Sequence, residues 1–243
     1  MRDCETISFP YRRGQPLSRR RREAGLTLIE VMIATAITAA MMMLAWQTIA
    51  STTDARRSFE SFEQRNHELR MALGRIVGDF EAAYLSKNED QNSPNPRTMM
   101  IARPTGKGVD IRFSTLGHRV LWGDANESEQ TVISYVLRAS PGRTSGQDWI
   151  RREQRRTSNL PWIDEPAEYD VLVHDIVSFK VEFWNWKNLE WQETWDTTQI
   201  DGQKNWLPSR VRITVAIKDA GNNERKLSTQ ARIAMQEPLN FVQ

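Results

Sequence analysis

An uninterrupted apolar stretch near the N-terminus, residues 26–50, constrains the chain more than any other feature. It reads LTLIEVMIATAITAAMMMLAWQTIA, with no proline or glycine and a single charged residue, Glu30. A helix of this length rises roughly 37 Å, which exceeds the roughly 30 Å of hydrocarbon in a bilayer. The stretch therefore predicts one membrane-spanning helix.

The charges on either side of this stretch predict its orientation. Residues 1–25 hold seven arginines against three acidic residues, a net of +4, so residues 26–243 carry −2 of the total charge of +2. The other flank has two charges of each sign, at Asp54, Arg56, Arg57 and Glu60. Because positive flanks stay inside, we expect residues 1–25 in the cytoplasm and the C-terminal body outside it. A nearly neutral body predicts no nucleic-acid partner.

A short motif joins the basic leader to the apolar stretch. Small residues precede the stretch, as Glu23-Ala24-Gly25, whereas an ordinary secretory signal has them after it. The junction Gly25-Leu26-Thr27-Leu28-Ile29-Glu30 resembles the type IV prepilin motif, with Leu26 where most of that family has phenylalanine. The resemblance implies cleavage after Gly25 by a prepilin peptidase, methylation of the new N-terminus at Leu26, and Glu30 at mature position five.

Glu30 is the most informative residue of this segment. A carboxylate within hydrocarbon is costly and usually has a partner or a task. We expect Glu30 to serve assembly, by pairing with the N-terminal amine of a neighbouring subunit. Pairing with the amine of its own chain, one turn away, is the alternative for Glu30, and a plain single-pass anchor with Gly25 as an interfacial residue is the alternative for the whole segment.

Residues 51–87 continue the pattern as an amphipathic helix. Their apolar residues recur at intervals of three and four, at Phe59, Phe62, Leu69, Leu73, Ile76, Val77, Phe80 and Tyr84. The opposite face carries Arg56, Glu60, Glu63, Arg65, Glu68, Arg75, Asp79 and Glu81. Since no proline occurs between Leu26 and Lys87, we expect one helix that continues from the anchor and lies across a sheet with its second half.

In residues 88–243 the apolar residues no longer recur at helical spacing, which predicts a β-rich domain. Residues 88–104 contain Asn and Pro residues typical of a loop. Apolar residues then alternate with polar ones in four segments, at Val109, Ile111 and Phe113; Ile133, Tyr135 and Leu137; Phe179, Val181 and Phe183; and Val211, Ile213, Val215 and Ile217. The turn 219–223 leads into a further strand, 224–234. A long helix ahead of strands joined by short turns predicts an α+β domain with an antiparallel sheet.

Six tryptophans fall within 45 residues of this domain, at Trp162, Trp184, Trp186, Trp191, Trp195 and Trp206. Buried indoles would build a core, whereas exposed ones would form a contact surface for proteins. We expect a split, with a minority exposed.

The sequence indicates neither a metal site nor a catalytic one. The single cysteine, Cys4, lies ahead of the apolar stretch, so it can form no disulfide within the chain. The three histidines, His67, His118 and His174, lack ligand spacing and are expected at the surface. A turn with Asp124, Asn126 and Ser128 resembles the start of a calcium loop, but Glu129 and Tyr135 replace its required glycine and glutamate. With no nucleophile elbow or P-loop either, we expect no metal, no cofactor and no enzyme.

A longer pattern resembles the minor pseudopilin J family of type II secretion systems. The matching segments are Asp79-Phe80-Glu81-Ala82-Ala83-Tyr84, Val173-His174-Asp175-Ile176-Val177-Ser178-Phe179, Phe183 and Trp184, Trp191 and Trp195, and Leu207-Pro208-Ser209-Arg210-Val211-Arg212-Ile213. The resemblance covers most of residues 25–235.

This resemblance implies a pilin-like fold with four parts: a leader peptide (1–25), a transmembrane helix (26–50), an amphipathic helix (51–87) and a β-rich periplasmic domain (88–243). It implies a minor pseudopilin at the tip of a periplasmic fibre, anchored in the bacterial inner membrane. The implied partners are other minor pseudopilins, the prepilin peptidase, the inner-membrane assembly platform and membrane lipid. The alternatives are a minor pilin of a type IV pilus and, from a different class, a membrane-tethered periplasmic enzyme or sugar-binding module.

Overall fold

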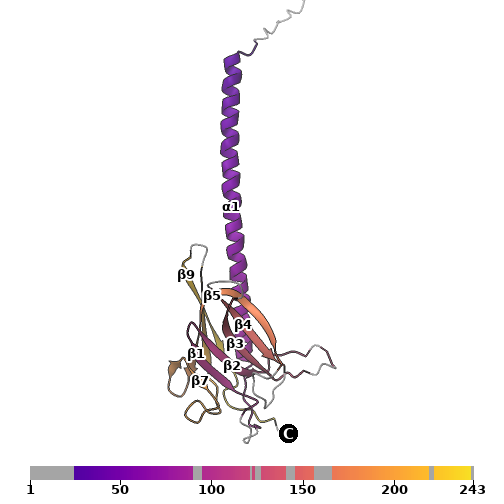
Figure 1. The fold of residues 1–243 in the computed structure, drawn as a ribbon, viewed down its shortest axis with the longest axis vertical. Helices are drawn as coiled ribbons and strands as arrows, with labels where there is room; N and C mark the ends of the chain where they lie inside the picture. Colours follow the sequence, from indigo (N-terminus) through magenta and orange to yellow (C-terminus); the bar gives the residue numbers. More distant parts are fainter. Residues whose placement is uncertain are drawn as a thin grey trace, which may run out of the picture. The chain divides into compact units, whose positions relative to one another are not determined.

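The computed structural model describes residues 25–89, 95–120, 122–123, 127–140, 146–155, 166–218 and 222–241. The chain divides into two units, residues 1–56 and 57–243. The long helix α1 (Leu28–Glu81) contributes its first part to one unit and its second part to the other (Figure 1). The second unit therefore begins within the helix, at residue 57.

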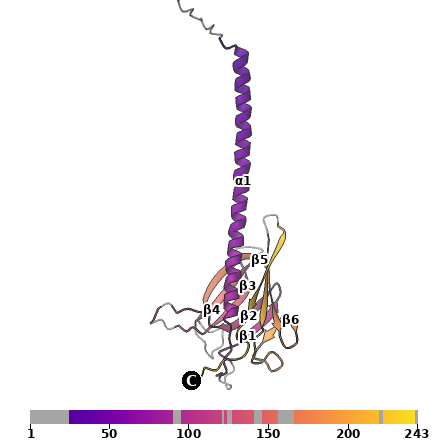
Figure 2. The same ribbon diagram turned by 180° about the vertical axis from the view of Figure 1, so that it is seen from behind.

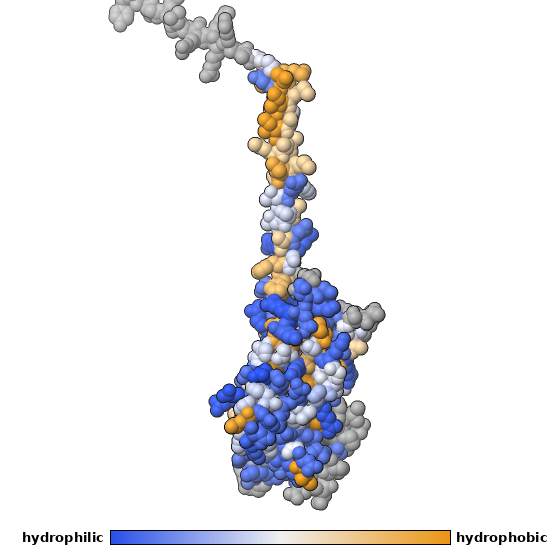
Figure 3. Space-filling view, turned by 90° about the vertical axis from the view of Figure 1, so that its left-hand side faces the viewer, coloured by the Kyte–Doolittle hydropathy of each residue, from blue (hydrophilic) through white to orange (hydrophobic). Residues whose placement is uncertain are grey.

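The first part of α1 is apolar and exposed. Trp46 is 74% exposed and Leu44 64%, and Figure 3 shows hydrophobic residues gathered towards the N-terminal end of the helix. Among the described residues, α1 is the one helix that is long and apolar enough to cross a membrane. Exposed apolar side chains of this kind match the predicted anchor at residues 26–50.

The second part of α1 ends at Glu81, six residues before the predicted end at Lys87. Backbone pairing with the sheet stops it there. Ala83 forms an antiparallel bridge with Thr115, and the Tyr84 N–H donates to the Ser114 carbonyl at 3.1 Å. These bonds take up backbone groups that a further helical turn would need, and no proline or glycine marks the position in the sequence.

In the described residues, nine strands form one antiparallel sheet in the order β7-β1-β2-β3-β4-β5-β8-β9, with β6 pairing with β5 off this path. The strands are β1 (Met100–Thr105), β2 (Gly108–Thr115), β3 (Thr131–Ala139), β4 (Gln147–Gln154), β5 (Glu168–Asn185), β6 (Glu190–Gln192), β7 (Trp195–Asp196), β8 (Arg210–Lys218) and β9 (Glu224–Arg232). The α+β class with an antiparallel sheet is confirmed.

The long strand β5 makes the sheet curl. Its first half pairs with β4 and its second half with β8, and register shifts interrupt both pairings. Such bulges bend a strand and increase its twist. The β1–β2 hairpin reaches back to the middle of β5, where the Phe179 N–H donates to the Lys107 carbonyl at 3.1 Å. Figures 1 and 2 show the second part of α1 lying against this curled sheet.

A row of aromatic rings runs through the core from α1 to β5. Phe80 stacks on Phe113 with ring centroids 4.5 Å apart, Phe113 is followed by Tyr135, and Trp149 and Phe179 complete the row. All five residues are at most 1% exposed. The alternating apolar residues predicted on β2, β3, β5 and β8 face this core, as their period of two requires.

Four strands were not predicted: β1, β4 and the short strands β6 and β7. β1 lies within the expected loop 88–104 and includes Pro104, which pairs with Val109 beside the hairpin turn. β7 pairs only with Ile101 and Ala102, so the proline lies where no second neighbour needs its missing N–H. β4 was missed because its sequence, QDWIRREQ, is mostly polar.

Candidate functional site

The predicted processing residues stand at the start of α1. Gly25 and Leu26 precede the helix and are exposed. Thr27 caps it. The backbone N–H and the hydroxyl of Thr27 both donate to Glu30 Oε2, at 2.9 and 2.8 Å, and the Glu30 N–H donates to Thr27 Oγ1 at 3.4 Å. This arrangement is a capping box, in which the two residues satisfy each other's backbone donors.

The capping box gives Glu30 a contact within its own chain that the sequence reasoning overlooked. The signal was present in the spacing Thr27-x-x-Glu30 ahead of an apolar run. Any assembly role of Glu30 must therefore be separated from its role as a cap.

A cluster of charges lies buried between α1 and β4. Asp79, predicted for the solvent face of the helix, is 4% exposed. Its Oδ2 accepts hydrogen bonds from Arg151 Nε at 2.8 Å and from the Tyr135 hydroxyl at 2.5 Å. Arg151 also donates from Nη1 to Glu153 Oε2 at 2.6 Å. Asp79 is thus an inward-facing ionic contact, and the expectation that it is solvated is wrong.

The pKa values of this cluster follow from its geometry. Burial raises the pKa of Glu153, but the hydrogen bond and the charge of Arg151 outweigh it and leave the pKa below its ordinary value. Burial lowers the pKa of Arg151, but the hydrogen bond and the charge of Asp79 raise it overall. Burial and the Asp79 carboxylate raise the pKa of Tyr135. Arg151 and Glu153 therefore carry their charges in the folded protein, and Tyr135 is a neutral donor to Asp79.

His118 extends this cluster, contrary to its predicted place at the surface. Its side chain is 12% exposed and lies between two carboxylates, with Nδ1 2.9 Å from Glu153 Oε1 and Nε2 2.9 Å from Glu127 Oε2. Glu127 is also paired with Arg155. His67 and His174 are exposed, as expected.

The tryptophans are split, as predicted. Trp195 is 1% exposed, whereas Trp186 is 36% exposed and marks the accessible end of a chain of rings. Trp206 lies between them, with its ring centroid 4.8 Å from Trp195 and 5.6 Å from Trp186. Trp184 and Trp191 are half-buried against each other. Trp162 lies outside the described residues.

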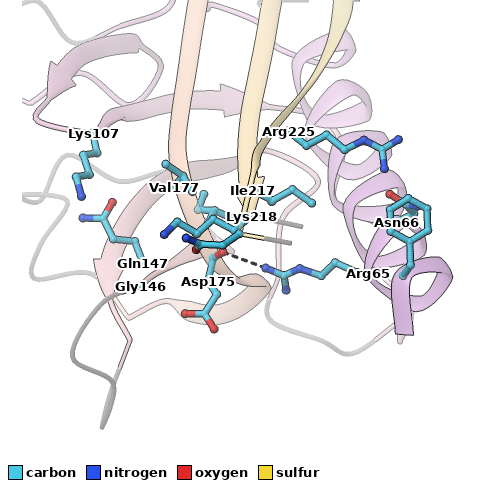
Figure 4. A pocket seen from close by; sticks show the side chains of 13 residues that line it. Arg65, Asn66, Lys107, Gly146, Gln147, Asp175, Val177, Ile217, Lys218 and Arg225 are labelled. Carbon is cyan, nitrogen blue, oxygen red and sulfur yellow. Dashed lines mark hydrogen bonds between the residues drawn. The ribbon is translucent and has the colours of Figure 1, made fainter. Parts of the chain in front are cut away.

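A cavity of about 640 Å³ opens where several elements of the body meet (Figure 4). α1 supplies Phe62, Arg65 and Asn66; the β1–β2 turn supplies Lys107; the start of β4 supplies Gly146 and Gln147; β5 supplies Asp175, Ile176 and Val177; and β8 and β9 with their connection supply Ile217, Lys218, Asn222 and Arg225. Four cationic side chains and one carboxylate line it.

The backbone at the cavity is fixed by two local features. Arg65 Nη2 donates to the Asp175 carbonyl at 3.0 Å and also to the His174 carbonyl. A side chain at Gly146, whose φ is +150°, would place its Cβ 2.0 Å from Asp175 Oδ1. The Asp175 carboxylate therefore lies against the Gly146 backbone, while the Asp175 carbonyl faces Arg65, so that only glycine fits at position 146.

Within the described part of the chain, no group of three or more His, Cys, Asp or Glu side chains has an arrangement that could hold a metal ion. Cys4 and the turn residues Asp124 and Asn126 lie outside that part.

Comparisons with known proteins bear on the whole chain. Residues 47–229 match the family model described as type II secretion system (T2SS), protein J, and residues 20–46 match the prokaryotic N-terminal methylation motif. A type II secretion system protein J from Klebsiella pneumoniae is 24% identical over 208 residues, which cover 84% of this chain and 94% of the relative.

Two solved structures are similar to the chain at low identity. A chain of the GspK-GspI-GspJ complex from the enterotoxigenic Escherichia coli type 2 secretion system aligns with a TM-score of 0.46 and 15% identity, over 69% of this chain and 97% of its own. A type IV-like pilin from Thermus thermophilus aligns with a TM-score of 0.43 and 9% identity, over 69% and 94%.

Proposed function

Because the chain belongs to the type II secretion system protein J family, it is a minor pseudopilin, and we propose that it assembles with other minor pseudopilins at the tip of a periplasmic pseudopilus. One observation carries this proposal: the family model spans residues 47–229, which include the second part of α1 and nearly all of the sheet. The match therefore covers the architecture that such a subunit needs.

We further propose how the chain reaches the membrane. The match of residues 20–46 to the methylation motif supports recognition by a prepilin peptidase, cleavage after Gly25 and methylation of Leu26. The seven arginines of residues 1–25 support a cytoplasmic N-terminus and a periplasmic body. The inner-membrane assembly platform is then the partner that receives the anchored subunit.

The mechanism we propose is assembly through α1. The apolar side chains of its first part are exposed, so they can pack against lipid or against helices of neighbouring subunits. Related helices that pack head to tail without closing a ring form a helical filament. Glu30 would pair with the amine of the next subunit, and its capping contact with Thr27 holds the carboxylate at the start of the helix.

No catalytic step is part of this function. The family consists of structural pseudopilins. We propose accordingly that the chain contributes surfaces and an anchor to the secretion machinery, and that it has no reaction of its own.

A deletion strain tests the proposal. We expect loss of the chain to abolish secretion of the enzymes that the type II system exports, and the full chain supplied in trans to restore it. The tagged chain should co-purify with other minor pseudopilins from the membrane. Normal secretion with loss of twitching would favour the type IV pilus instead, and an activity or a bound sugar in the purified chain, without pseudopilin partners, would favour the tethered enzyme or binding module.

A further inference from the structure

We propose that the cavity between α1, β5, β8 and β9 is a binding site for an acidic peptide segment of a partner protein. The inference goes beyond the assembly role and does not depend on it, because it concerns the body alone. It rests on the charge of the cavity, on an acceptor atom that lacks a donor, and on the apolar side chains among the lining residues.

The side chains that line the cavity carry an excess of positive charge. Arg65, Lys107, Lys218 and Arg225 line the cavity together with a single carboxylate, Asp175, which leaves a surplus of three positive charges. Among the described residues, no acidic side chain forms an ion pair with Lys107, Lys218 or Arg225. Like charges placed around one cavity by four elements repel one another, so an anionic ligand is favoured there.

The carboxylate of Asp175 does little to offset this surplus. It lies against the Gly146 backbone, and the Asp148 side chain accepts the Asp175 N–H. Figure 4 shows the Asp175 carboxylate pointing away from Arg65, which contacts the carbonyl of Asp175. The backbone carbonyl of Asp175 therefore orients the Arg65 side chain.

One of the lining residues has an acceptor atom without a donor. The Oε1 atom of Gln147 is buried, and no described residue donates a hydrogen bond to it. A buried acceptor left in this state is costly, so a ligand that brings a donor is favoured. A peptide has carboxylates for the cations as well as backbone N–H groups, which can donate to Gln147 once its side chain turns so that Oε1 faces the cavity. An inorganic phosphate ion satisfies mainly the cations.

The size and the apolar surface of the cavity also fit a peptide. Phe62, Ile176, Val177 and Ile217 add hydrocarbon to the lining, and Arg225 lies over the Phe62 ring with its Cζ 5.0 Å from the centroid. The cavity of about 640 Å³ falls in the range of about 300–1,000 Å³ that holds ligands of drug size. A few residues of peptide with apolar and acidic side chains fill such a volume, whereas a lone anion would leave most of it empty.

The strand next to the cavity offers backbone contacts as well. Val177 is the extra residue of the bulge in β5, because Ile176 pairs with Ile217 and Ser178 with Ala216. A bulge residue stands outside the regular ladder. Its place in the lining gives an extended peptide a backbone neighbour beside the cations.

The test uses the full chain in micelles of a neutral detergent and measures the fluorescence anisotropy of labelled hexapeptides. One peptide alternates leucine with glutamate, and the matched peptide alternates leucine with glutamine. We expect saturable binding of the glutamate peptide, at least tenfold tighter than that of the glutamine peptide. Because screening shortens the reach of charges, affinity should fall as salt rises from about 0.02 to about 0.2 M.

Variants locate the site. Lys107→Glu combined with Lys218→Glu reverses two exposed charges and should weaken binding at least tenfold. Lys87→Glu combined with Lys226→Glu makes the same change of net charge outside the cavity and should alter binding less than twofold. If the first pair binds the peptide as tightly as the parent chain, the peptide binds outside the cavity and the proposal is overturned.

Competition separates a peptide from a lipid headgroup. Glycerol 3-phosphate and phosphoethanolamine are added against the bound glutamate peptide. We expect neither to displace it at tenfold excess. Displacement by either compound with an affinity equal to that of the peptide would assign the cavity to a phosphate-bearing headgroup and overturn the proposal, and so would equal binding of the glutamine peptide.

Discussion

Arg151 on β4 donates its Nε hydrogen to Asp79 on α1 at 2.8 Å, with the two side chains only 2% and 5% exposed. A buried pair of this kind is sensitive to the loss of either partner, because the remaining charge stays in a medium that cannot solvate it. The pair links α1 to β4 by a hydrogen-bonded ion pair, in addition to the apolar contacts around it. The second part of α1 is therefore integral to the body.

A first prediction concerns where the body begins. A truncated chain that starts at Asp54 should be soluble and cooperatively folded, because every residue of the buried core lies between Leu69 and Ile233. A chain that starts at Asn88 should not fold, since it lacks seven of those core residues and Asp79. Circular dichroism with thermal unfolding distinguishes the two chains. A folded chain from Asn88 would contradict the role given to α1.

The same truncated chain from Asp54 should need neither metal nor a disulfide. It contains no cysteine. We expect its melting temperature to stay within about 1 °C when a chelator or a reductant is added. A drop of several degrees with the chelator would reveal a bound ion, because an ion that binds only the native state stabilises it by mass action.

A third prediction isolates the buried pair. In the truncated chain from Asp54, Asp79→Asn should lower the free energy of unfolding by about 3–5 kcal/mol, because it removes the charge that Arg151 contacts through Nε and Nη2 and leaves this buried cation with Glu153 alone. Urea titration measures the change. Glu81→Gln, on the exposed side of the same helix, is the control and should change it by less than about 0.5 kcal/mol. An equal effect of both substitutions would show that the pair adds nothing to stability.

The lowered pKa of Glu153 predicts a pH dependence. A carboxyl whose pKa is lower in the folded than in the unfolded state contributes stability above its unfolded pKa, near 4.5, and loses it as pH falls through the folded value. The difference in unfolding free energy between the parent chain and Glu153→Gln should thus be largest at neutral pH and shrink below pH 4.5. A difference that stays constant from pH 7 to pH 3 would contradict a charged Glu153.

A fifth prediction separates the two roles of Glu30. Glutamine can take the place of glutamate in a capping box, so Glu30→Gln keeps the contact with Thr27 and removes only the charge. If the charge pairs with the amine of a neighbouring subunit, Glu30→Gln and Glu30→Ala should impair secretion and co-purification with other pseudopilins equally. Both variants should still be cleaved after Gly25, as the intact mass of the membrane-purified chain reports. Full activity of the glutamine variant would assign Glu30 to capping alone.

Much of the fold was predictable because its strands obey a simple period. Val109, Ile111 and Phe113 alternate in the sequence as they do in the sheet, and all three are buried. β4 escaped prediction because Arg151 and Glu153 occupy inward positions that such a pattern reserves for apolar residues. Their burial depends on Asp79, which is far away in the sequence, and no local rule anticipates that partnership.

The candidate sites likewise differ in whether the sequence alone could predict them. Gly25, Leu26 and Glu30 could be identified because their meaning lies in consecutive residues. The basic cavity could not, because Arg65 and Lys218 are brought together only by the curl of the sheet against α1. His118 shows the same limit, since Glu153, one of its two carboxylate neighbours, is brought to it only by the pairing of β4 in the sheet.

The core shared by α1 and the last strands can be completed only when synthesis of the chain is almost finished. Leu69 and Phe80 leave the ribosome long before Val215 and Ile233, with which they share one core. At about 5–20 residues per second, the helix waits on the order of ten to thirty seconds for its last partners. Throughout that interval its apolar face has no completed sheet to cover it, so the nascent chain needs a chaperone or a nearby surface until the final strands arrive.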